Sequence, residues 1–171
     1  MLRTVLLLVI LIGAIAIVSL LFLSGHTLQR TSSQADFALQ YHFSAETYYQ
    51  DIDIHQSTLT YTRFEDTERK CETWIPQAPC WTPNDLKTSQ AMLTTDELQS
   101  LKDLIEQTHF MELKDTYGGA DANQRYYTYL FSVQLGDVKK TVTYQSFPGA
   151  ASMPEALTQL QEILFQLVKK W

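Results

Sequence analysis

The pattern of hydrophobic and polar positions divides the chain into an apolar head and a longer body. Residues 5–23 carry no charge, and only Gly13 and Ser19 interrupt their apolar run. As a helix, a run of this length at about 1.5 Å per residue spans most of the roughly 30 Å hydrocarbon core of a bilayer. The pattern predicts a signal anchor, or transmembrane helix, at residues 1–25, a polar tether at 26–35 and a single extracytoplasmic domain at 36–171.

A cleaved signal peptide is the competing interpretation of this run. Such peptides have a shorter apolar core of about 7–15 residues and a cleavage site of small residues. Here bulky Phe22 and Leu23 precede the only small pair, Ser24-Gly25. Arg3 on the N-terminal side favours an inside N-terminus. The expected location is the cytoplasmic (plasma) membrane, crossed once through residues 5–23, with the body on the extracytoplasmic, or periplasmic, side.

Alternation of apolar and polar residues predicts the strands of the body. The predicted strands are residues 37–43, 49–55, 58–64, 86–93, 125–135 and 138–145. Gly136-Asp137 between the last two is a two-residue hairpin turn. Residues 117–124 contain two glycines and are predicted to form a flexible loop.

Apolar residues at helical spacing predict two amphipathic helices. Thr94 and Glu97 form a capping box ahead of a helix at residues 95–110, and Ser152 and Glu155 form another ahead of the terminal helix. The apolar positions are Leu98, Leu101, Leu104 and Ile105 in the first helix and Leu157, Leu160, Leu164 and Leu167 in the second. The predicted fold class is α+β: an N-terminal transmembrane helix, then an antiparallel sheet of about five to seven strands with both helices packed on one face.

Charge narrows the range of partners. Of the 13 basic residues only Arg3 precedes the apolar run, so the rest of the chain has 12 basic against 19 acidic residues and a net charge of −7. A negative body is a poor partner for phosphate backbones, so no nucleic-acid partner is expected. The 12% aromatic content argues against a disordered tail, and the body is long enough for one hydrophobic core.

The only two cysteines, Cys71 and Cys80, lie in a stretch at residues 71–84 that holds three of the five prolines. Proline cannot donate to a strand ladder, so this stretch is a loop or an edge. The spacing predicts a disulfide that closes a short loop in an oxidising compartment. A metal site is a weaker alternative, because no second pair of cysteines or histidines lies at ligand spacing. Two unpaired buried thiols are the third possibility.

Candidate catalytic residues are few. Asp51, Asp53 and His55 share one face of a predicted strand, where they could bind a metal or act as acid and base. The simpler interpretation is the solvated face of an antiparallel sheet. Residues 115–123 lack the ligand spacing of a calcium loop, and the common nucleophile, phosphate and dinucleotide motifs are absent. We therefore assign no catalytic, cofactor-binding or metal-ligating residue and expect no cofactor.

One strand combines bulky side chains on both faces. Tyr126, Thr128 and Leu130 alternate along one face, and Tyr117 begins the loop before it. Exposed aromatic residues beside a polar rim are typical of interaction surfaces. These four residues are the predicted binding surface. The alternative is that Tyr126 and Leu130 are buried beneath the segment from Trp74 to Trp81.

Four short motifs carry a resemblance. They are Thr94-Thr-Asp-Glu-Leu98, Tyr117-Gly-Gly-Ala-Asp121, Gly136-Asp-Val-Lys-Lys-Thr-Val142 and Pro154-Glu-Ala-Leu157. In this order they resemble a loose group of uncharacterised bacterial extracytoplasmic α+β domains, many of them lipoproteins. Here His26 stands where the lipid-attachment box requires a cysteine. The resemblance implies a fold and a compartment and no reaction.

Two functional classes are compatible with these observations. The first is a non-enzymatic binding or accessory module of the cell envelope, such as an inhibitor or immunity-like protein, with a protein partner. The predicted anchor, the acidic balance and the lack of convergent catalytic residues favour it. The second is a hydrolase that uses Asp51, Asp53, Glu65 or His55.

Overall fold

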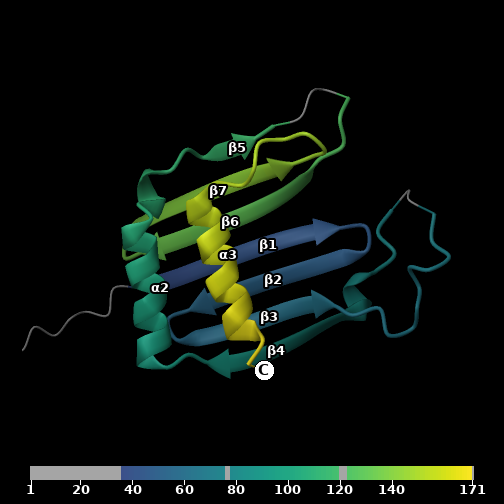
Figure 1. Ribbon diagram of the computed structural model, residues 1–171. Coiled ribbons are helices and arrows are strands. Elements are labelled where there is room, and N and C mark those ends of the chain that lie inside the picture. The colour runs from purple at the N-terminus through teal and green to yellow at the C-terminus, as the bar shows by residue number, and fades with distance from the viewer. Residues whose placement is uncertain (1–35, 76–77, 120–122, 171) are drawn as a thin grey trace, which may run out of the picture. The chain divides into compact units, whose positions relative to one another are not determined.

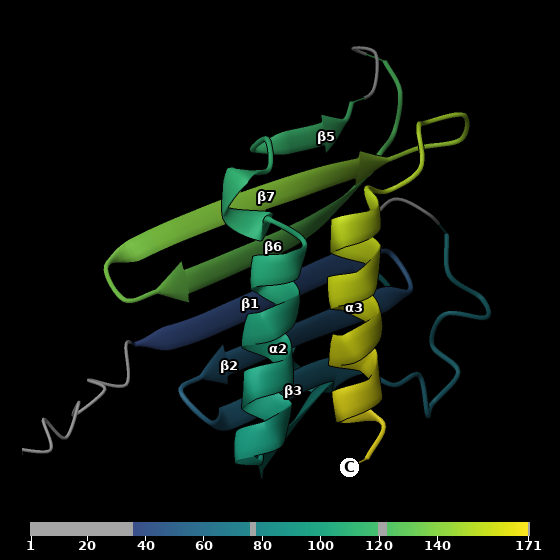
Figure 2. The same cartoon turned by 60° about the vertical axis from the view of Figure 1, so that its left-hand side comes forward.

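The computed structural model describes residues 36–75, 78–119 and 123–170. Within these ranges seven strands form one sheet, and two α-helices cover one of its faces (Figures 1 and 2). The strands are β1 (Phe37–Ala45), β2 (Tyr48–His55), β3 (Thr58–Phe64), β4 (Leu86–Met92), β5 (Thr116–Gly118), β6 (Tyr127–Leu135) and β7 (Val138–Ser146). The helices are α2 (Thr95–Gln107) and α3 (Glu155–Val168), with short 3-10 turns η1 (Pro83–Asp85) and η2 (Phe110–Glu112).

The sheet is mixed, and this corrects the predicted antiparallel sheet. Its strand order is β4-β3-β2-β1-β6-β7-β5. Every neighbouring pair is antiparallel except β5 and β7. The chain reverses direction between β5 and β6, so β5 runs opposite to β6 and in the same direction as β7.

The edge strand β5 forms from residues that the sequence assigned in part to a loop. Its last residue, Gly118, has a φ of +72°, which favours glycine. A Cβ atom at this position would lie 2.1 Å from the backbone oxygen of Gln145 in β7. Gly118 is therefore held against a strand, and its lack of a side chain permits that close approach.

The predicted fold class also included an N-terminal transmembrane helix. None of the helices in the described parts of the chain is both long and apolar enough to cross a bilayer. The helices α2 and α3 have 13 and 14 residues, and each presents one apolar face to the sheet. The predicted span at residues 5–23 and the tether lie outside the described residues. The fold class is corrected to a seven-stranded mixed sheet with two helices.

The core lies between the helices and the sheet. Figure 2 shows α2 and α3 side by side across the same face. The strands contribute Phe37, Leu39, Tyr41, Ile52, Ile54, Leu59, Tyr61, Phe131, Val133, Val142 and Tyr144, and the helices contribute Leu98, Leu101, Ile105, Leu157, Leu160, Leu164 and Leu167. Tyr41 is buried in this layer, where its hydroxyl accepts a 2.7 Å hydrogen bond from Gln161 of α3. Burial raises the pKa of Tyr41 well above its ordinary value.

The two predicted capping boxes have different outcomes. The box of α2 is confirmed: the Thr94 hydroxyl accepts from the Glu97 backbone at 3.2 Å, and the Glu97 carboxylate accepts from the Thr94 backbone at 2.8 Å. The prediction of a capping box at Ser152 is wrong, because the N-cap of α3 is Pro154 and no side chain caps this helix. Ser152 lies two residues ahead of the helix boundary, outside the position that a capping hydroxyl needs.

The first helix ends earlier than predicted. Its last residue is Gln107, and His109 adopts a left-handed conformation with a φ of +50°. This reversal begins η2, which turns Phe110 into the core with no exposed surface. Phe110, the last residue of the predicted helix, therefore belongs to a separate turn.

Candidate functional site

The face of the sheet opposite the helices is polar and is called the open face here. Strand register places eight threonines on it: Thr58, Thr60, Thr62, Thr88, Thr116, Thr128, Thr141 and Thr143. Their hydroxyls pair across strands, as between Thr62 and Thr88 at 3.0 Å. A β-branched residue with a hydroxyl suits a strand that meets water on one side.

A groove crosses the open face at one end of β1 and β6 and is called the tyrosine groove. It has a volume of about 410 Å³ and is lined by His42, Ser44, Ala45, Glu46, Pro79, Tyr126, Tyr127, Thr128 and Leu130. The lining includes three residues of the predicted binding surface: Tyr126, Thr128 and Leu130. Tyr126 is 45% exposed, so the segment from Trp74 to Trp81 does not bury it.

The fourth residue of the predicted surface lies on the other face. Tyr117 in β5 stands opposite Tyr144 in β7 and packs against the core. Its hydroxyl accepts a hydrogen bond from the Lys114 backbone at 3.2 Å. Residues in register on parallel strands share a face, so the pairing of β5 separates Tyr117 from the groove.

One wall of the groove is Pro79 of the segment between β3 and η1, residues 65–82, called the disulfide loop. The Trp81 indole donates a 2.8 Å hydrogen bond to the carbonyl of Ala45, and the Cys80 backbone donates one of 2.8 Å to the carbonyl of Glu46. The Trp81 ring also packs edge-on against Tyr49, with ring centres 4.9 Å apart. The loop is thereby attached to the turn between β1 and β2, beside the groove.

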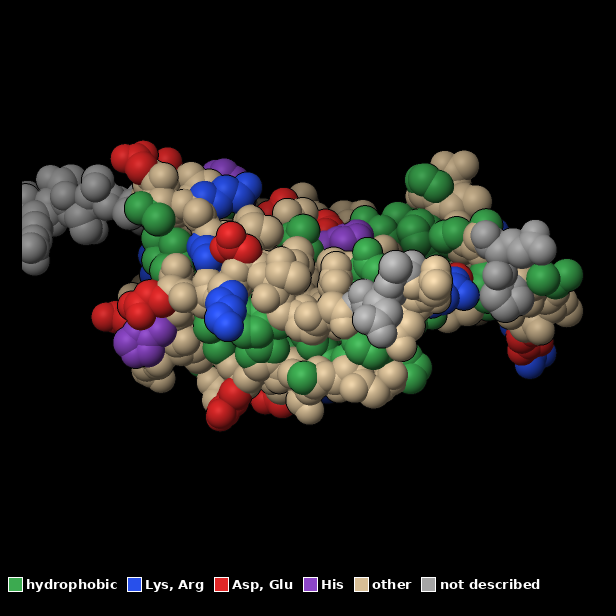
Figure 3. All heavy atoms as spheres, turned by 90° about the horizontal axis from the view of Figure 1, so that it is seen from above, with side chains coloured by type: hydrophobic (Ala, Val, Ile, Leu, Met, Phe, Trp, Pro, Cys, Tyr) green, Lys and Arg blue, Asp and Glu red, His purple; other side chains and the backbone are tan. Residues whose placement is uncertain are grey.

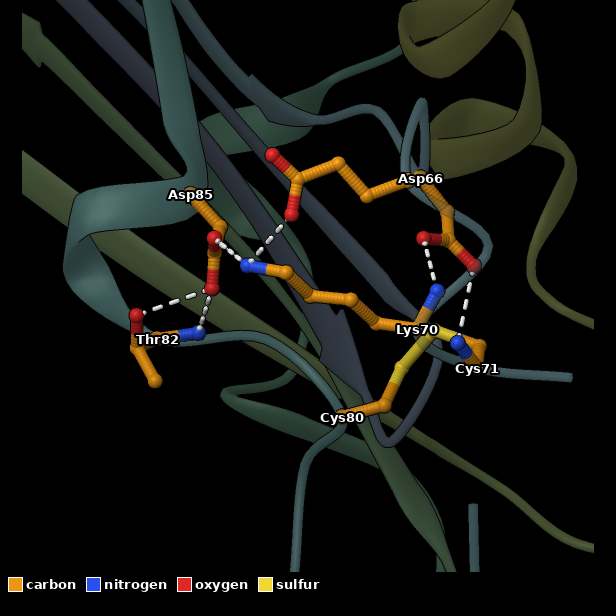
Figure 4. A network of polar contacts seen from close by, with 7 residues as sticks. Asp66, Lys70, Cys71, Cys80, Thr82 and Asp85 are labelled. Carbon is orange, nitrogen blue, oxygen red and sulfur yellow. Dashed lines mark hydrogen bonds and ion pairs between the residues drawn. A yellow bond between two sulfur atoms is a disulfide. The ribbon is translucent and has the colours of Figure 1, made fainter. Parts of the chain in front are cut away.

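The predicted disulfide between Cys71 and Cys80 is present and joins Cα atoms 5.4 Å apart. Close to the disulfide, the carboxylate of Asp66 binds the backbone of the residues that lead into Cys71 (Figure 4). The two oxygens of Asp66 accept hydrogen bonds from the backbones of Lys70, at 2.7 Å, and Cys71, at 2.9 Å. A covalent bond and two local hydrogen bonds therefore hold the same short segment.

A second contact joins this segment to η1. The Lys70 ammonium forms ion pairs with Asp85 and with Glu68 (Figure 4). Asp85 also accepts from the Thr82 backbone at 2.9 Å and from its hydroxyl at 2.8 Å. The bond from Lys70, followed by those from Thr82, lowers the pKa of Asp85 to about 2. The loop that walls the groove is thus ordered at both of its ends.

The charges in and beside the tyrosine groove are paired. The His42 Nδ1 lies 3.2 Å from an oxygen of Asp51, its neighbour on β2. Glu46 accepts a 2.9 Å hydrogen bond from the Tyr127 hydroxyl and forms an ion pair with Arg125. The available surface of the groove therefore consists of an aromatic ring, hydroxyls and an apolar patch, with little unpaired charge.

The structure separates the residues considered for a hydrolase. Asp51, Asp53 and His55 lie along β2 on the open face, whereas Glu65 follows β3 and is paired with Arg63 at 2.6 Å and Lys87 at 3.0 Å. Burial, and then repulsion from Asp51, raises the pKa of Asp53. Within the described ranges no cluster of three or more metal-ligating side chains forms, and no serine or threonine hydroxyl is hydrogen-bonded to His42.

Sequence reasoning missed the contribution of His42, Glu46 and Pro79 to the groove. The register of the first hairpin was the available signal for His42, since pairing Ala45 with Tyr48 brings position 42 opposite Asp51. The contact between the disulfide loop and the turn at Glu46 had no such signal, because it joins segments more than 30 residues apart.

Charge does not concentrate on the side of the molecule that Figure 3 shows. Seen from the β5 edge, acidic, basic and histidine side chains are scattered among uncharged surface. A scan against protein-family models and a search of curated proteins found no match to this chain. The tyrosine groove, with its exposed ring and ordered wall, is therefore the feature from which a function can be inferred.

Proposed function

We propose that the body is a non-enzymatic binding module of the cell envelope that holds a segment of a protein partner in the tyrosine groove. The observation that carries this proposal is the 45% exposure of Tyr126 at the edge of a groove that Pro79 walls on one side. Tyrosine offers a large rigid contact area with a polar tip and has only two side-chain torsions to order. An inhibitor or an immunity-like protein would use such a surface.

The chemistry of the groove favours an uncharged partner segment. Ser44 and Thr128 supply hydroxyls, and Leu130 supplies apolar surface. The Nδ1 of His42 is already engaged with Asp51. A short partner segment with one apolar side chain and free backbone amides would satisfy these groups.

The proposed compartment is the extracytoplasmic, or periplasmic, side of the membrane. Both cysteines of the chain are joined in one disulfide. Structural disulfides persist in oxidising compartments and are rare in the cytosol of mesophiles. This chemistry supports an envelope role for the body.

Site-specific photo-crosslinking tests the proposal. A photoreactive phenylalanine analogue at position 126 of the full chain should form an adduct with one defined partner in intact cells. Position 138 is the control, because Val138 is 62% exposed, lies on the opposite face of the sheet and does not line the tyrosine groove. Adducts of equal yield at both positions would contradict the proposal.

The partner identified in this way permits a quantitative test. Tyr126→Ala should weaken its binding at least tenfold and leave the melting midpoint within a few degrees, whereas Val138→Ala should leave binding unchanged. If Tyr126→Ala lowers the melting midpoint strongly while the folded fraction still binds normally, Tyr126 is a structural residue and the groove is not the contact surface.

A hydrolase is the second candidate, and the pairing of His42 with Asp51 favours it. A histidine oriented by a carboxylate can act as a general base. Such an enzyme should release product from simple ester substrates, and Asp51→Asn should abolish the release. Purified full chain without esterase activity and without bound metal would exclude this candidate for those substrates.

A further inference from the structure

A second pocket lies on the helix-covered face, where the last turns of α3 cross β2 and β3 (Figure 1). Its volume is about 360 Å³, and we call it the α3 pocket. It is lined by Tyr48, Gln50, Tyr61, Arg63, Phe165, Val168 and Lys169. Three aromatic rings and two cations therefore meet in it, and no carboxylate belongs to its lining.

One polar group in this lining has no partner. The amide nitrogen of Gln50 donates a 2.8 Å hydrogen bond to the Tyr61 hydroxyl, while its oxygen Oε1 is buried with no hydrogen bond. Turning the amide over would pair the oxygen with Tyr61 and leave the nitrogen unpaired instead. Native proteins seldom leave a buried polar atom unpaired, so a ligand that both accepts and donates hydrogen bonds would fit here.

The two cations have unused hydrogen-bonding capacity. Arg63 donates through Nε to Glu65 at 2.6 Å, and its guanidinium lies 5.0 Å from the centre of the Tyr61 ring. Neither the terminal nitrogens of Arg63 nor the Lys169 ammonium has a carboxylate partner among the residues that the structure describes. A guanidinium fork and an ammonium together suit a carboxylate.

The remaining lining is largely apolar. Phe165 and Val168 are half-buried on α3, and the Phe165 ring packs edge-on against Tyr41 at 5.6 Å. Tyr48 closes one side, and the partial burial of its hydroxyl raises the pKa of that group to about 12. The hydroxyl of Tyr48 therefore stays protonated and neutral near pH 7, and it adds a hydrogen-bond donor beside the rings.

We propose that the α3 pocket binds an N-acylated amino acid with an apolar side chain and a free carboxylate. The carboxylate pairs with Arg63 and Lys169, the side chain packs against Phe165 and Val168, and the adjacent amide satisfies Gln50. A free acylated amino acid and the last residue of a peptide share this chemistry. The site lies on the face opposite the tyrosine groove, so it is independent of the proposed capture of a partner.

Calorimetric titration of the full chain tests the pocket with defined probes. N-acetyl-L-phenylalanine should bind at least tenfold more tightly than its methyl ester, which has the same body but no negative charge. A tetrapeptide that ends in phenylalanine with a free carboxylate distinguishes the two sources, because tighter binding than the acetyl derivative identifies a peptide terminus. Equal affinity for the acid and the ester would overturn the proposal without any variant.

Variants then locate the site. Arg63→Gln and Tyr48→Ala should each weaken binding of N-acetyl-L-phenylalanine at least tenfold. The matched control for the first is Arg69→Gln, because Arg69 is likewise ion-paired with a nearby glutamate, Glu72, but is outside the pocket. The control for the second is Val138→Ala, because Val138 is exposed but lines neither the α3 pocket nor the tyrosine groove. Equal losses from the pocket variants and their controls would show unspecific attraction and overturn the assignment, whatever the outcome at the tyrosine groove.

Discussion

Leu130 and Phe131 are neighbours on β6, yet they belong to opposite faces of the sheet. Phe131 has no exposed surface and lies 5.1 Å, ring centre to ring centre, from Tyr41 beneath the helices. Leu130 is half-buried in the lining of the tyrosine groove. The same alternation runs along every central strand, so each strand contributes one row of residues to the core and one row to the open face.

The two faces differ in what holds their side chains. On the helix-covered face, apolar groups are removed from water by α2 and α3, which is the main source of folding free energy. On the open face, hydroxyls pair across strands while the side chains keep contact with water, as between Thr62 and Thr88 at 3.0 Å. Stability is therefore concentrated on one face, which leaves the other free to carry a binding surface.

Adjacent truncations on β6 should give the largest difference between the faces. Phe131→Ala should lower the free energy of unfolding by about 3–5 kcal/mol, because it leaves a cavity in the core. Leu130→Ala should cost about 1 kcal/mol or less, since its side chain is only half-buried. Urea denaturation of both variants measures the contrast, and similar losses would mean that the open face also carries core packing.

Removal of the disulfide tests whether the core folds without the bond that closes the loop beside the tyrosine groove. Cys71→Ser with Cys80→Ser should cost about 2–4 kcal/mol, mainly through a freer unfolded chain, and the body should still fold. Urea denaturation measures the loss, and thiol titration of the unfolded, unreduced wild-type protein should detect no free thiol. Two free thiols per chain would contradict both the bond and the proposed compartment.

The starts of α2 and α3 permit a comparison within the helix-covered face, because a side chain caps only α2. Thr94→Ala should cost about 1 kcal/mol, because the Glu97 amide loses its acceptor at the start of α2. Ser152→Ala should leave thermal stability unchanged, since Pro154 starts α3 without a side-chain cap. A loss from Ser152→Ala as large as that from Thr94→Ala would restore the capping box that the structure excludes.

The smallest expected effect is a dependence of stability on pH. An ion pair from Lys170, with hydrogen bonds from Thr94, lowers the pKa of Glu97 from 4.5 to about 2. The ionised carboxylate therefore stabilises the fold above about pH 4.5, and this contribution is lost as the pH falls toward 2.

Denaturation curves between pH 6 and 2.5 measure the contribution of Glu97. Glu97→Gln should flatten the fall of stability over this range, whereas Glu162→Gln on α3 is the control and should leave the slope unchanged. Identical slopes in wild-type protein and Glu97→Gln would show that the carboxylate does not couple folding to protons.

The strands, turns and helix starts could be predicted from the sequence because each depends on the pattern of apolar and polar residues within a short segment. Alternation identified β1, β2 and β3, Gly136 identified the turn between β6 and β7, and Thr94 identified the start of α2. The cysteine spacing likewise identified a bond that closes a short ring. Each of these features lies within about a dozen consecutive residues, so local physical chemistry determines it.

The tertiary structure decided which elements meet. Gly118 pairs with Gln145 where β5 joins the sheet parallel to β7, and this pairing places Tyr117 on the helix-covered face. Pro79 and Tyr126 come together in the lining of the tyrosine groove. The α3 pocket joins Gln50 to Phe165, more than 100 residues apart. Such contacts depend on the packing of the whole sheet against its helices, and the hydrophobic period of a single segment does not encode that packing. The sequence alone therefore determined the elements and the chemistry of each face, whereas the tertiary structure brought the residues of each site together.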